Sequence, residues 1–289
     1  MSDATTSPGR MLREAVAANA IQVPGAPNAL VGRMIEEMGF AAIYLSGAAV
    51  SAGVLAMPDV GLVTLTELVQ QLEFLTARVT IPVIVDADTG FGDAANVERT
   101  VAELERAGAA AIQLEDQQLP KRCGHLSGKT LVDADEMCAK LRAAAAARTD
   151  DQTVIIARTD ARSVEGFDGA IERAWRYVAA GADWIFPEAL RSREEFADFA
   201  ASIKGPSAEA GPRLVANMTE FGQSPLLDFD DLAGLGYRVV LYPVTLLRVA
   251  MKVIESTLSL LAADGTQRDL LDLMQTREEL YDLLDYEVN

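Results

Sequence analysis

Eight short runs of apolar and β-branched residues, separated by segments of helical length, constrain this chain more than any other feature of its sequence. The runs begin at Ile21, Ala41, Ile81, Ala110, Thr153, Asp183, Arg213 and Arg238. Such runs indicate buried strands, and strands that alternate with helices pair in parallel. Four of the helical segments end in a glycine just before the next strand, where a left-handed residue commonly ends a helix: Gly39, Gly108, Gly181 and Gly236.

Eight strands, each followed by a helix, are the count of a closed (β/α)8 barrel of the TIM type. An open doubly wound sheet could also use eight strands, but it usually carries a glycine-rich nucleotide-binding turn after an early strand, and this sequence has none. No low-complexity linker divides the chain. We therefore expect one domain over residues 1–289, with strands between about 21 and 242 and a helical extension over about 245–289. The apolar faces of that extension need a partner surface, on the same barrel or on a neighbouring subunit.

Composition excludes several classes of partner. The chain has 43 acidic residues against 25 Lys and Arg, a net charge of −18, which repels nucleic acids and anionic membranes. The N-terminus lacks the apolar run of a secretory signal, and Arg248, Lys252 and Glu255 interrupt the most apolar late segment. The two cysteines are too few for a disulfide framework and fit a reducing compartment. We expect a cytoplasmic protein with neither nucleic-acid nor membrane partners.

Polar residues follow six consecutive predicted strands, at the end of the barrel where such enzymes place their active sites. They are Ser46-Gly47, Asp86 and Asp88, Glu115, Arg158, Glu188, and Asn217 with Thr219. Asp86 and Asp88 lie two residues apart and so share one side of a strand, where they could form an all-oxygen site with Glu115. Oxygen ligands suit Mg²⁺, with Mn²⁺ as a substitute. The alternative is that both aspartates only cap backbone groups in the DADTGFG turn.

The stretch KRCGHLSGK, residues 121–129, holds three cations, the only histidine and one of the two cysteines. Its GHLSGKT segment is no phosphate-binding loop, because that motif has four residues between its glycines and this one has three. Cationic neighbours favour a thiolate or a ready proton donor at Cys123, whereas Cys138 is expected to be a buried apolar residue. The loop would attract a polyanionic substrate. A divalent cation and a thiol suit C–C cleavage of an α-hydroxy or α-keto acid, which leaves a carbanion to be protonated.

The motifs SGAAVSA, DADTGFG, LEDQ, KRCGH, ARTDA, FPEA and ANMTEFG, in this order, resemble the isocitrate lyase/phosphoenolpyruvate mutase superfamily from about Arg10 to about Tyr286. Within it, the chain is most similar to the 2-methylisocitrate lyases. The resemblance implies a Mg²⁺-dependent lyase that cleaves 2-methylisocitrate to pyruvate and succinate, in propionate catabolism by the methylcitrate cycle. It also implies a homotetramer whose C-terminal helices are exchanged between subunits.

The resemblance implies roles for individual residues as well. Cys123 would protonate the succinate carbanion, with His125 beside it on a gating loop, and Tyr44 would help to deprotonate the substrate hydroxyl. The metal site would consist of Asp86, Asp88, Glu115 and, through water, Asp59. The substrate would contact Ser46, Gly47 and Ala48 at its pyruvate end and elsewhere Cys123, Gly124, Arg158, Glu188, Asn217, Thr219, Arg248 and Arg277.

Two departures from the 2-methylisocitrate lyase pattern keep alternatives open. Position 48 is Ala where a second glycine is typical, and the loop continues HLSGK, which is closer to the longer isocitrate lyases. Related short enzymes act on 2,3-dimethylmalate or oxaloacetate, so these acids and isocitrate are alternative substrates. A non-catalytic binding barrel is a further alternative, because a fold alone does not establish activity. The intact Cys123 and the three metal-site acids argue against it.

Overall fold

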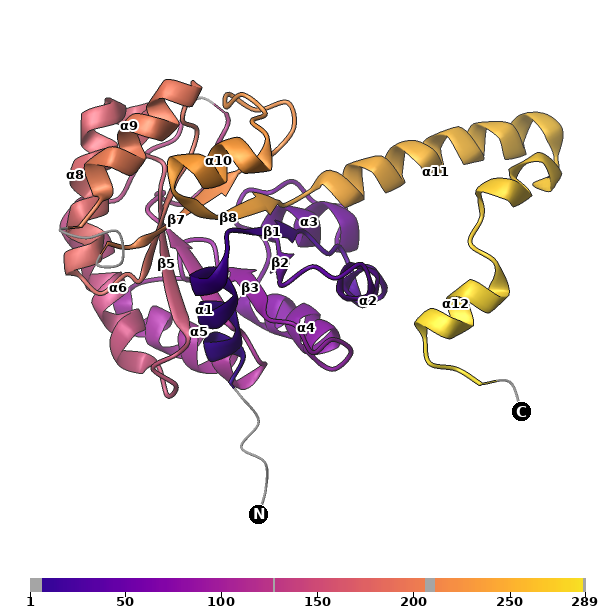
Figure 1. Ribbon diagram of the computed structural model, residues 1–289, viewed down its shortest axis with the longest axis horizontal. Coiled ribbons are helices and arrows are strands. Elements are labelled where there is room, and N and C mark those ends of the chain that lie inside the picture. Colours follow the sequence, from indigo (N-terminus) through magenta and orange to yellow (C-terminus); the bar gives the residue numbers. More distant parts are fainter. Residues whose placement is uncertain (1–6, 127, 206–210, 288–289) are drawn as a thin grey trace, which may run out of the picture.

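The computed structural model describes residues 7–126, 128–205 and 211–287, and its eight parallel strands form a nearly closed barrel (Figure 1). Each strand lies within or overlaps one of the predicted runs, so the predicted (β/α)8 architecture is confirmed. The strands are β1 Ile21–Pro24, β2 Ile43–Leu45, β3 Val83–Asp86, β4 Ala111–Glu115, β5 Val154–Thr159, β6 Trp184–Pro187, β7 Arg213–Asn217 and β8 Tyr237–Tyr242.

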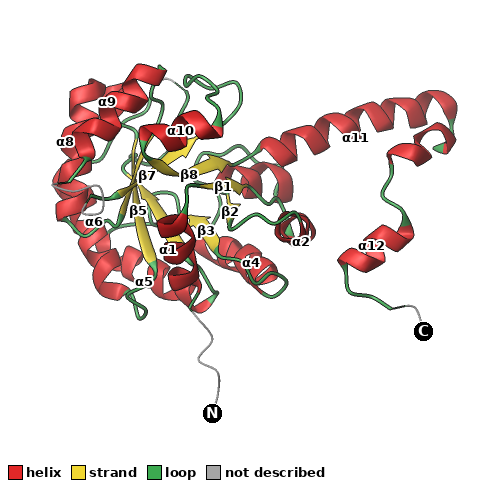
Figure 2. Cartoon of the chain, in the orientation of Figure 1, coloured by secondary structure: helices red, strands yellow, loops and turns green. Residues whose placement is uncertain are grey.

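Most of the helices cover the outside of the barrel, and α11, Thr245–Asp264, projects away from it (Figure 2). The helices are α1 Pro8–Ala18, α2 Ala29–Glu37, α3 Gly47–Ala49, α4 Leu65–Thr76, α5 Ala94–Arg106, α6 Ala134–Ala147, α7 Ala161–Val164, α8 Gly166–Ala179, α9 Arg193–Ile203, α10 Phe229–Leu235, α11 Thr245–Asp264 and α12 Arg277–Leu283, with a π-helix η1 at Val50–Val54 and a 3₁₀ helix η2 at Arg268–Leu273. The four glycines predicted to end helices all have φ between +82° and +108°. These helix ends are therefore confirmed.

The barrel closes around β1. Neighbouring strands pair in the order β1-β8-β7-β6-β5-β4-β3-β2, and the remaining seam between β1 and β2 is bridged just beyond β1. There the Gly25 N–H donates to the Tyr242 carbonyl at 2.9 Å, and the Ala26 N–H donates to the Tyr44 carbonyl at 3.0 Å. One short segment thus joins the first, second and eighth strands.

Alternation along the strands divides the apolar residues into two cores. In β5, Val154 and Ile156 face the barrel interior, whereas Ile155 and Ala157 pack against the surrounding helices. Leu12 and Val16 of α1 belong to the interior core and close its floor. Side chains on a strand alternate between its two faces. The next inward-facing side chain, at the carboxyl end of each strand, therefore lies above this apolar floor.

The C-terminal extension leaves the barrel. Helix α11 projects outward from the barrel, and the chain then turns back through α12 (Figure 1). Just after α12, Asp285 pairs with Arg33 of α2 at 2.6 Å. None of the residues of α11 is buried, and Val249, Val253 and Leu258 are each more than half exposed. Packing on the chain's own barrel therefore does not cover this apolar surface. Among the described residues, no helix is both long enough and apolar enough to cross a bilayer.

Replacing Gly25 by alanine should destabilise the protein, because an added Cβ would collide with the Pro243 backbone carbonyl. We expect urea unfolding to show a loss of about 3 kcal/mol. Gly234→Ala is the matched control, since an added Cβ at that exposed position in α10 meets no atom within 4 Å. A helical Gly→Ala change of this kind should leave stability unchanged or raise it by about 0.5 kcal/mol. Equal stability of the two variants would contradict the proposed closure.

Candidate active site

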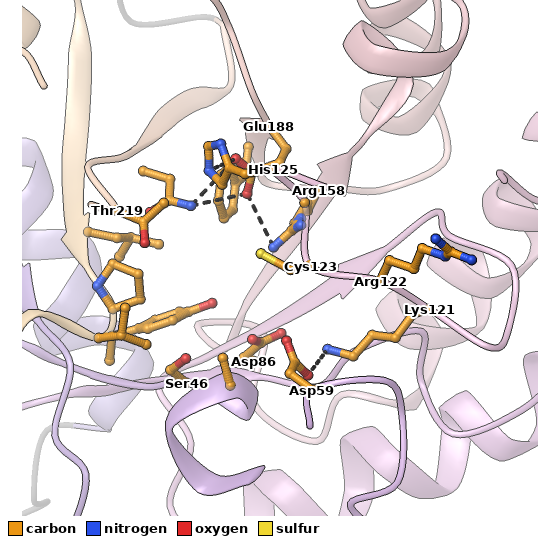
Figure 3. A pocket seen from close by; sticks show the side chains of 18 of the residues that line it. Ser46, Asp59, Asp86, Lys121, Arg122, Cys123, His125, Arg158, Glu188 and Thr219 are labelled. Carbon is orange, nitrogen blue, oxygen red and sulfur yellow. Dashed lines mark hydrogen bonds and ion pairs between the residues drawn. The ribbon is translucent and has the colours of Figure 1, made fainter. Parts of the chain in front are cut away.

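Strand alternation brings most of the predicted site residues to one pocket at the carboxyl end of the barrel (Figure 3). Arg158 continues the inward series of Val154 and Ile156, and Glu188 likewise follows Trp184 and Phe186. Of the residues predicted to act in catalysis or binding, the pocket is lined by Tyr44, Ser46, Ala48, Asp59, Asp86, Cys123, Gly124, His125, Arg158, Glu188, Asn217, Thr219 and Arg248.

The remaining predicted residues lie elsewhere. Gly47 is adjacent to the pocket, and its N–H donates to Asp86 Oδ2 at 3.2 Å. Asp88 and Glu115 are buried beneath the pocket lining, with 7% and 2% of their surfaces exposed. Arg277 begins α12 and lines a separate surface depression. The fold of a single chain therefore assembles the predicted set apart from Arg277.

Gln113 is a central residue that the sequence interpretation missed. Its side chain is fully buried on β4, where Nε2 donates to Asp86 Oδ1 at 3.1 Å and Oε1 accepts from the Tyr44 hydroxyl at 2.9 Å. Burial and the nearby charge of Asp86 raise the pKa of Tyr44 well above its usual value. Tyr44 therefore remains protonated at neutral pH. It would assist the deprotonation of a substrate by hydrogen bonding and not as a base. The sequence contained one indication of this residue: Gln113 is the single amide in the strand segment AAIQLED.

Lys121 enters the acidic side of the pocket and pairs with Asp88 and, at 2.6 Å, with Asp59. Burial alone would lower the pKa of Lys121, but the charges of Glu115 and Asp88 raise it well above its usual value. Burial nevertheless raises the pKa of Asp88 to about 6 and that of Glu115 well above the usual range. The cations present therefore do not fully compensate the buried acids.

This acidic side fits a hard cation in composition, although its acids do not form a ready-made cage. The described residues include no group of three His, Cys, Asp or Glu side chains placed to hold a metal ion together. Mg²⁺, however, usually takes one or two protein carboxylates and keeps several waters. Asp86 and Asp59 face the pocket, and Glu115 Oε1 is buried without a hydrogen-bond partner among the described residues. Buried carboxylate oxygens are unfavourable without a compensating charge. A hydrated cation at the pocket would supply that charge.

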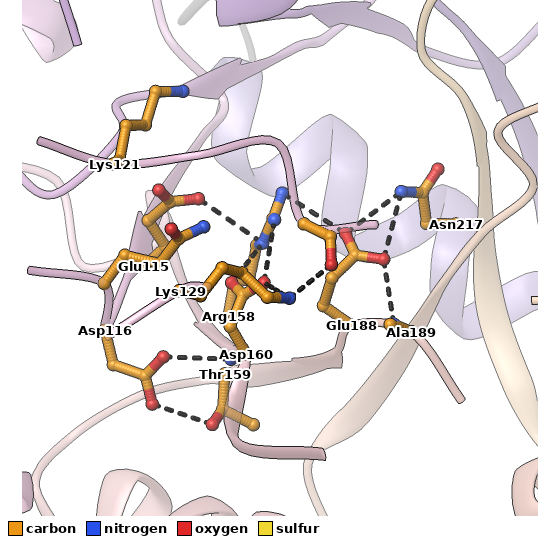
Figure 4. Close-up of polar contacts among 12 residues, drawn as sticks. Glu115, Asp116, Lys121, Lys129, Arg158, Thr159, Asp160, Glu188, Ala189 and Asn217 are labelled. Atoms are coloured by element: carbon orange, nitrogen blue, oxygen red, sulfur yellow. Dashed lines mark hydrogen bonds and ion pairs between the residues drawn. The ribbon is translucent and has the colours of Figure 1, made fainter. Parts of the chain in front are cut away.

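The opposite side of the pocket is a chain of charged hydrogen bonds (Figure 4). Arg158 Nη1 lies 3.3 Å from Glu188 Oε2, which accepts from Asn217 Nδ2 at 3.1 Å. His125 Nε2 lies 2.9 Å from Glu188 Oε1. Burial favours the protonated form of Glu188, but Arg158, His125 and Asn217 together outweigh it, so the pKa of this carboxyl falls well below its usual range. Glu188 is therefore ionised and holds three neighbouring side chains in place.

Lys129 ties the base of loop 121–129 to the barrel, a role that the sequence interpretation did not identify. Its side chain is 1% exposed, and its ammonium lies 2.7 Å from Asp160 Oδ1 and also donates to the Gly124 carbonyl (Figure 4). Asp160 in turn accepts from Arg158 Nε at 3.0 Å. An added Cβ on Gly124 would lie 2.6 Å from Glu188 Cγ. A glycine is required here because the loop backbone approaches these side chains closely.

Comparison with known proteins identifies the family. The family described as phosphoenolpyruvate phosphomutase matches residues 12–262. The chain belongs to this family. A 2-methylisocitrate lyase of Aeropyrum pernix is 54% identical over 280 residues, 96% of this chain and 88% of the relative. The superfamily indicated by the motifs is thus confirmed.

Solved structures agree with this assignment. A crystal structure of 2,3-dimethylmalate lyase, described as a member of the PEP mutase/isocitrate lyase superfamily, has a TM-score of 0.89 and 34% identity, covering 97% of this chain and 93% of that one. A structure of phosphonopyruvate hydrolase in complex with oxalate and Mg²⁺ has a TM-score of 0.85 and 29% identity, covering 97% and 95% of the two chains. Carboxylate ligands and Mg²⁺ therefore occur within this family.

Lys121→Met should destabilise the protein in the presence of a chelator, because it leaves Asp59 and Asp88 without their ammonium partner. We expect a loss of about 3 kcal/mol in urea unfolding, as for other broken buried ion pairs. Arg106→Met is the control, since Arg106 pairs with Glu103 at the surface of α5 with 70% of its side chain exposed. That change should cost less than about 0.5 kcal/mol. Similar costs for both variants would mean that Lys121 does not compensate buried charge.

Proposed function

We propose that this protein cleaves 2-methylisocitrate to pyruvate and succinate. The observation that carries the proposal is the position of Cys123 in one pocket with Asp86 and Arg158 (Figure 3). A thiol, an acidic cation-binding side and a guanidinium are the groups that C–C cleavage of a hydroxy tricarboxylate requires. The 54% identity to a 2-methylisocitrate lyase selects this substrate over the other acids handled within the family.

Charge divides the pocket between the two ends of the substrate. We assign the pyruvate end to Ser46, Gly47 and Ala48, which lie beside Asp86. We assign the succinate end to the opposite side, where Arg158, Asn217 and Thr219 line the pocket and Glu188 orients the first two. Gly124, His125 and Arg248 complete the lining. Binding a flexible tricarboxylate at both ends orients the bond between its two halves for cleavage.

We propose Mg²⁺ as the cofactor, with Mn²⁺ as a substitute. Asp86, Asp88 and Glu115 would hold the ion, and Asp59 would act through water. Asp59 and Asp86 line the pocket, and Asp88 and Glu115 are buried next to it. When bound, the ion would stabilise the negative charge on the substrate hydroxyl oxygen when that oxygen loses its proton. The Mg²⁺ in the related phosphonopyruvate hydrolase complex supports this assignment. Lys121 stays paired with Asp59 and Asp88 beside it.

Cys123 supplies the proton that completes the reaction. The substrate hydroxyl gives its proton to water, and its oxygen forms the pyruvate carbonyl as the C–C bond between the two halves breaks. The electron pair of that bond remains on the succinate carbon, which takes a proton from the Cys123 thiol. The thiolate regains a proton from water, so the products together have the same composition as the substrate. Cys123 is exposed on its loop and close to Arg158, as Figure 3 shows. A reactive exposed thiol favours a reducing compartment, and we place the enzyme in the cytoplasm.

Cys123→Ser should reduce turnover of 2-methylisocitrate by at least about 100-fold, because an alcohol is a much weaker acid than a thiol. Pyruvate release from the purified protein, with and without chelator, measures both the thiol and the metal requirement. Cys138→Ser is the matched control: Cys138 is buried on α6, where its thiol donates only to the Arg176 carbonyl at 3.6 Å. This variant should keep wild-type turnover, and chelation should abolish turnover in both the wild type and the control.

Substrate choice needs a parallel test with isocitrate, 2,3-dimethylmalate and oxaloacetate. A higher kcat/KM on one of these acids would replace the proposed substrate and leave the lyase assignment intact. Full activity of Cys123→Ser would contradict the proton-donor role. Absence of turnover on all four acids, in a folded protein stabilised by Mg²⁺, would contradict the proposed function.

We also propose a homotetramer in which α11 and α12 pack on neighbouring subunits. The support is the exposed apolar surface of α11, together with the position of Arg277 outside its own chain's pocket. In such an assembly, Arg277 could reach the pocket of another subunit. Apolar surface on this scale is normally covered in a soluble protein.

Leu258→Asp should weaken the assembly, because it places a charge on the apolar face of α11, where Leu258 is 60% exposed. Ser259→Asp is the control: it adds the same charge on the polar stripe formed by Arg248, Lys252, Glu255 and Ser259. Light scattering should show a tetramer for the wild type and the control, and a smaller species for Leu258→Asp. A wild-type monomer with full activity would overturn the exchange.

A further inference from the structure

The segment that follows β7 reaches across the pocket mouth and binds His125. The backbone N–H of Gln223 donates to His125 Nδ1 at 2.9 Å, and the Gln223 side-chain amide donates to the His125 carbonyl at 2.8 Å. Positions 125 and 223 are 98 residues apart in the sequence. A single residue of one loop thus holds both the ring and the backbone of a histidine on another loop.

These contacts determine which ring nitrogen carries the hydrogen. A nitrogen that accepts a hydrogen bond has no hydrogen, so Nδ1 is unprotonated and the ring is neutral. The hydrogen is then on Nε2, which lies 2.9 Å from Glu188 Oε1 without forming a well-directed hydrogen bond to any described residue. A protonated imidazolium would direct an N–H from Nδ1 against the Gln223 N–H, which is unfavourable. The Gln223 backbone therefore selects the tautomer that faces Glu188.

Gly222 allows this close approach. An added Cβ at position 222 would lie 2.5 Å from His125 Nδ1 and 2.8 Å from both Cγ and Cε1 of the ring. Position 222 has no left-handed φ, so alanine would conflict with the imidazole without straining the backbone. The glycine is therefore needed because the ring of His125 packs against the backbone.

The other end of the same segment is anchored to α11. Glu220 accepts a hydrogen bond from Thr245 and lies 3.5 Å from Arg248 Nε. The Arg248 guanidinium also lies 5.3 Å from the centre of the Phe221 ring. Because Arg248 lines the pocket, residues 220–223 connect two parts of its mouth, the loop of His125 and the start of α11.

We propose that Gly222 and Gln223 are positioning residues that fix His125 in the neutral form with hydrogen on Nε2 and hold Cys123 and His125 in the pocket lining. We call residues 220–223 the latch. Neither Gly222 nor Gln223 acts on substrate; both act through His125. The consequence for turnover rests on the proposed function, whereas the tautomer and the loop contacts do not.

Because His125 is the only histidine in the chain, its state can be read directly by ¹⁵N-histidine NMR on the full-length protein. At neutral pH the wild type should show one neutral ring with hydrogen on Nε2. Gly222→Ala should change this spectrum to that of a displaced, tautomer-averaged ring, and Gln223→Ala should broaden it, because the carbonyl tether is lost. In activity assays, we expect kcat to fall about 10- to 100-fold for Gly222→Ala, with a smaller loss for Gln223→Ala.

Matched controls separate the latch from general effects of substitution. Gly234→Ala repeats the glycine change in open space, and Gln70→Ala removes an exposed glutamine from α4. Both should keep the wild-type spectrum and turnover, and circular dichroism should confirm that all variants are folded. Wild-type spectra in folded Gly222→Ala and Gln223→Ala, or hydrogen on Nδ1 in the wild type, would overturn the proposal. The predicted spectral changes in a protein that turns over none of the tested acids would support the latch and refute the proposed function.

Discussion

Negative charge buried at the carboxyl end of the barrel must be compensated, and loop 121–129 provides much of that compensation. Lys121 pairs with Asp59 and Asp88, the His125 ring faces Glu188, and Lys129 pairs with Asp160. An unpaired carboxylate in such surroundings would be strongly unfavourable or would take up a proton. This explains why so acidic a chain concentrates cations in one loop. Their positions are complementary to the acids beneath them, and Cys123 is carried into the pocket with them.

The buried negative charge is compensated more fully on one side of the pocket than on the other. This difference gives the two sides different roles in binding. Around Glu188, the Arg158 charge and the contacts with His125 and Asn217 together outweigh burial and lower the pKa, so that side is a fixed, ionised scaffold. Around Asp88 and Glu115, burial raises both pKa values despite the nearby cations. The second side therefore favours additional positive charge, whereas the first has the donors to orient a carboxylate. A substrate that combines several carboxylates with a cation-chelating hydroxyl matches both sides.

The strands and the inward residues at their ends could be predicted from the sequence, because both depend on a local period of two. Arg158, Glu188 and Asn217 each occupy the next inward position after an apolar pair or residue. Contacts between distant loops could not be predicted, since nothing in the local pattern specifies that Lys129 reaches Asp160 or that Gln223 reaches His125. Gln113 is intermediate: an amide in a fully buried strand requires partners, but the sequence does not name them. The position of Arg277 in a separate surface depression could not be predicted either, because it depends on the direction in which the chain leaves α11.

Polar contacts hold the loop of Cys123 against the barrel. Leu126, a large apolar side chain on this loop, is 58% exposed, so apolar burial contributes little at that point. Hydrogen bonds to charged groups contribute about 1.5–3 kcal/mol each, and removing one partner of a buried ion pair costs more. The geometry of these contacts is specific, because Lys121 and Lys129 pair with different acids and the ring of His125 packs against Gly222. Charge compensation beneath the loop thus gives Cys123 a defined position in the pocket lining.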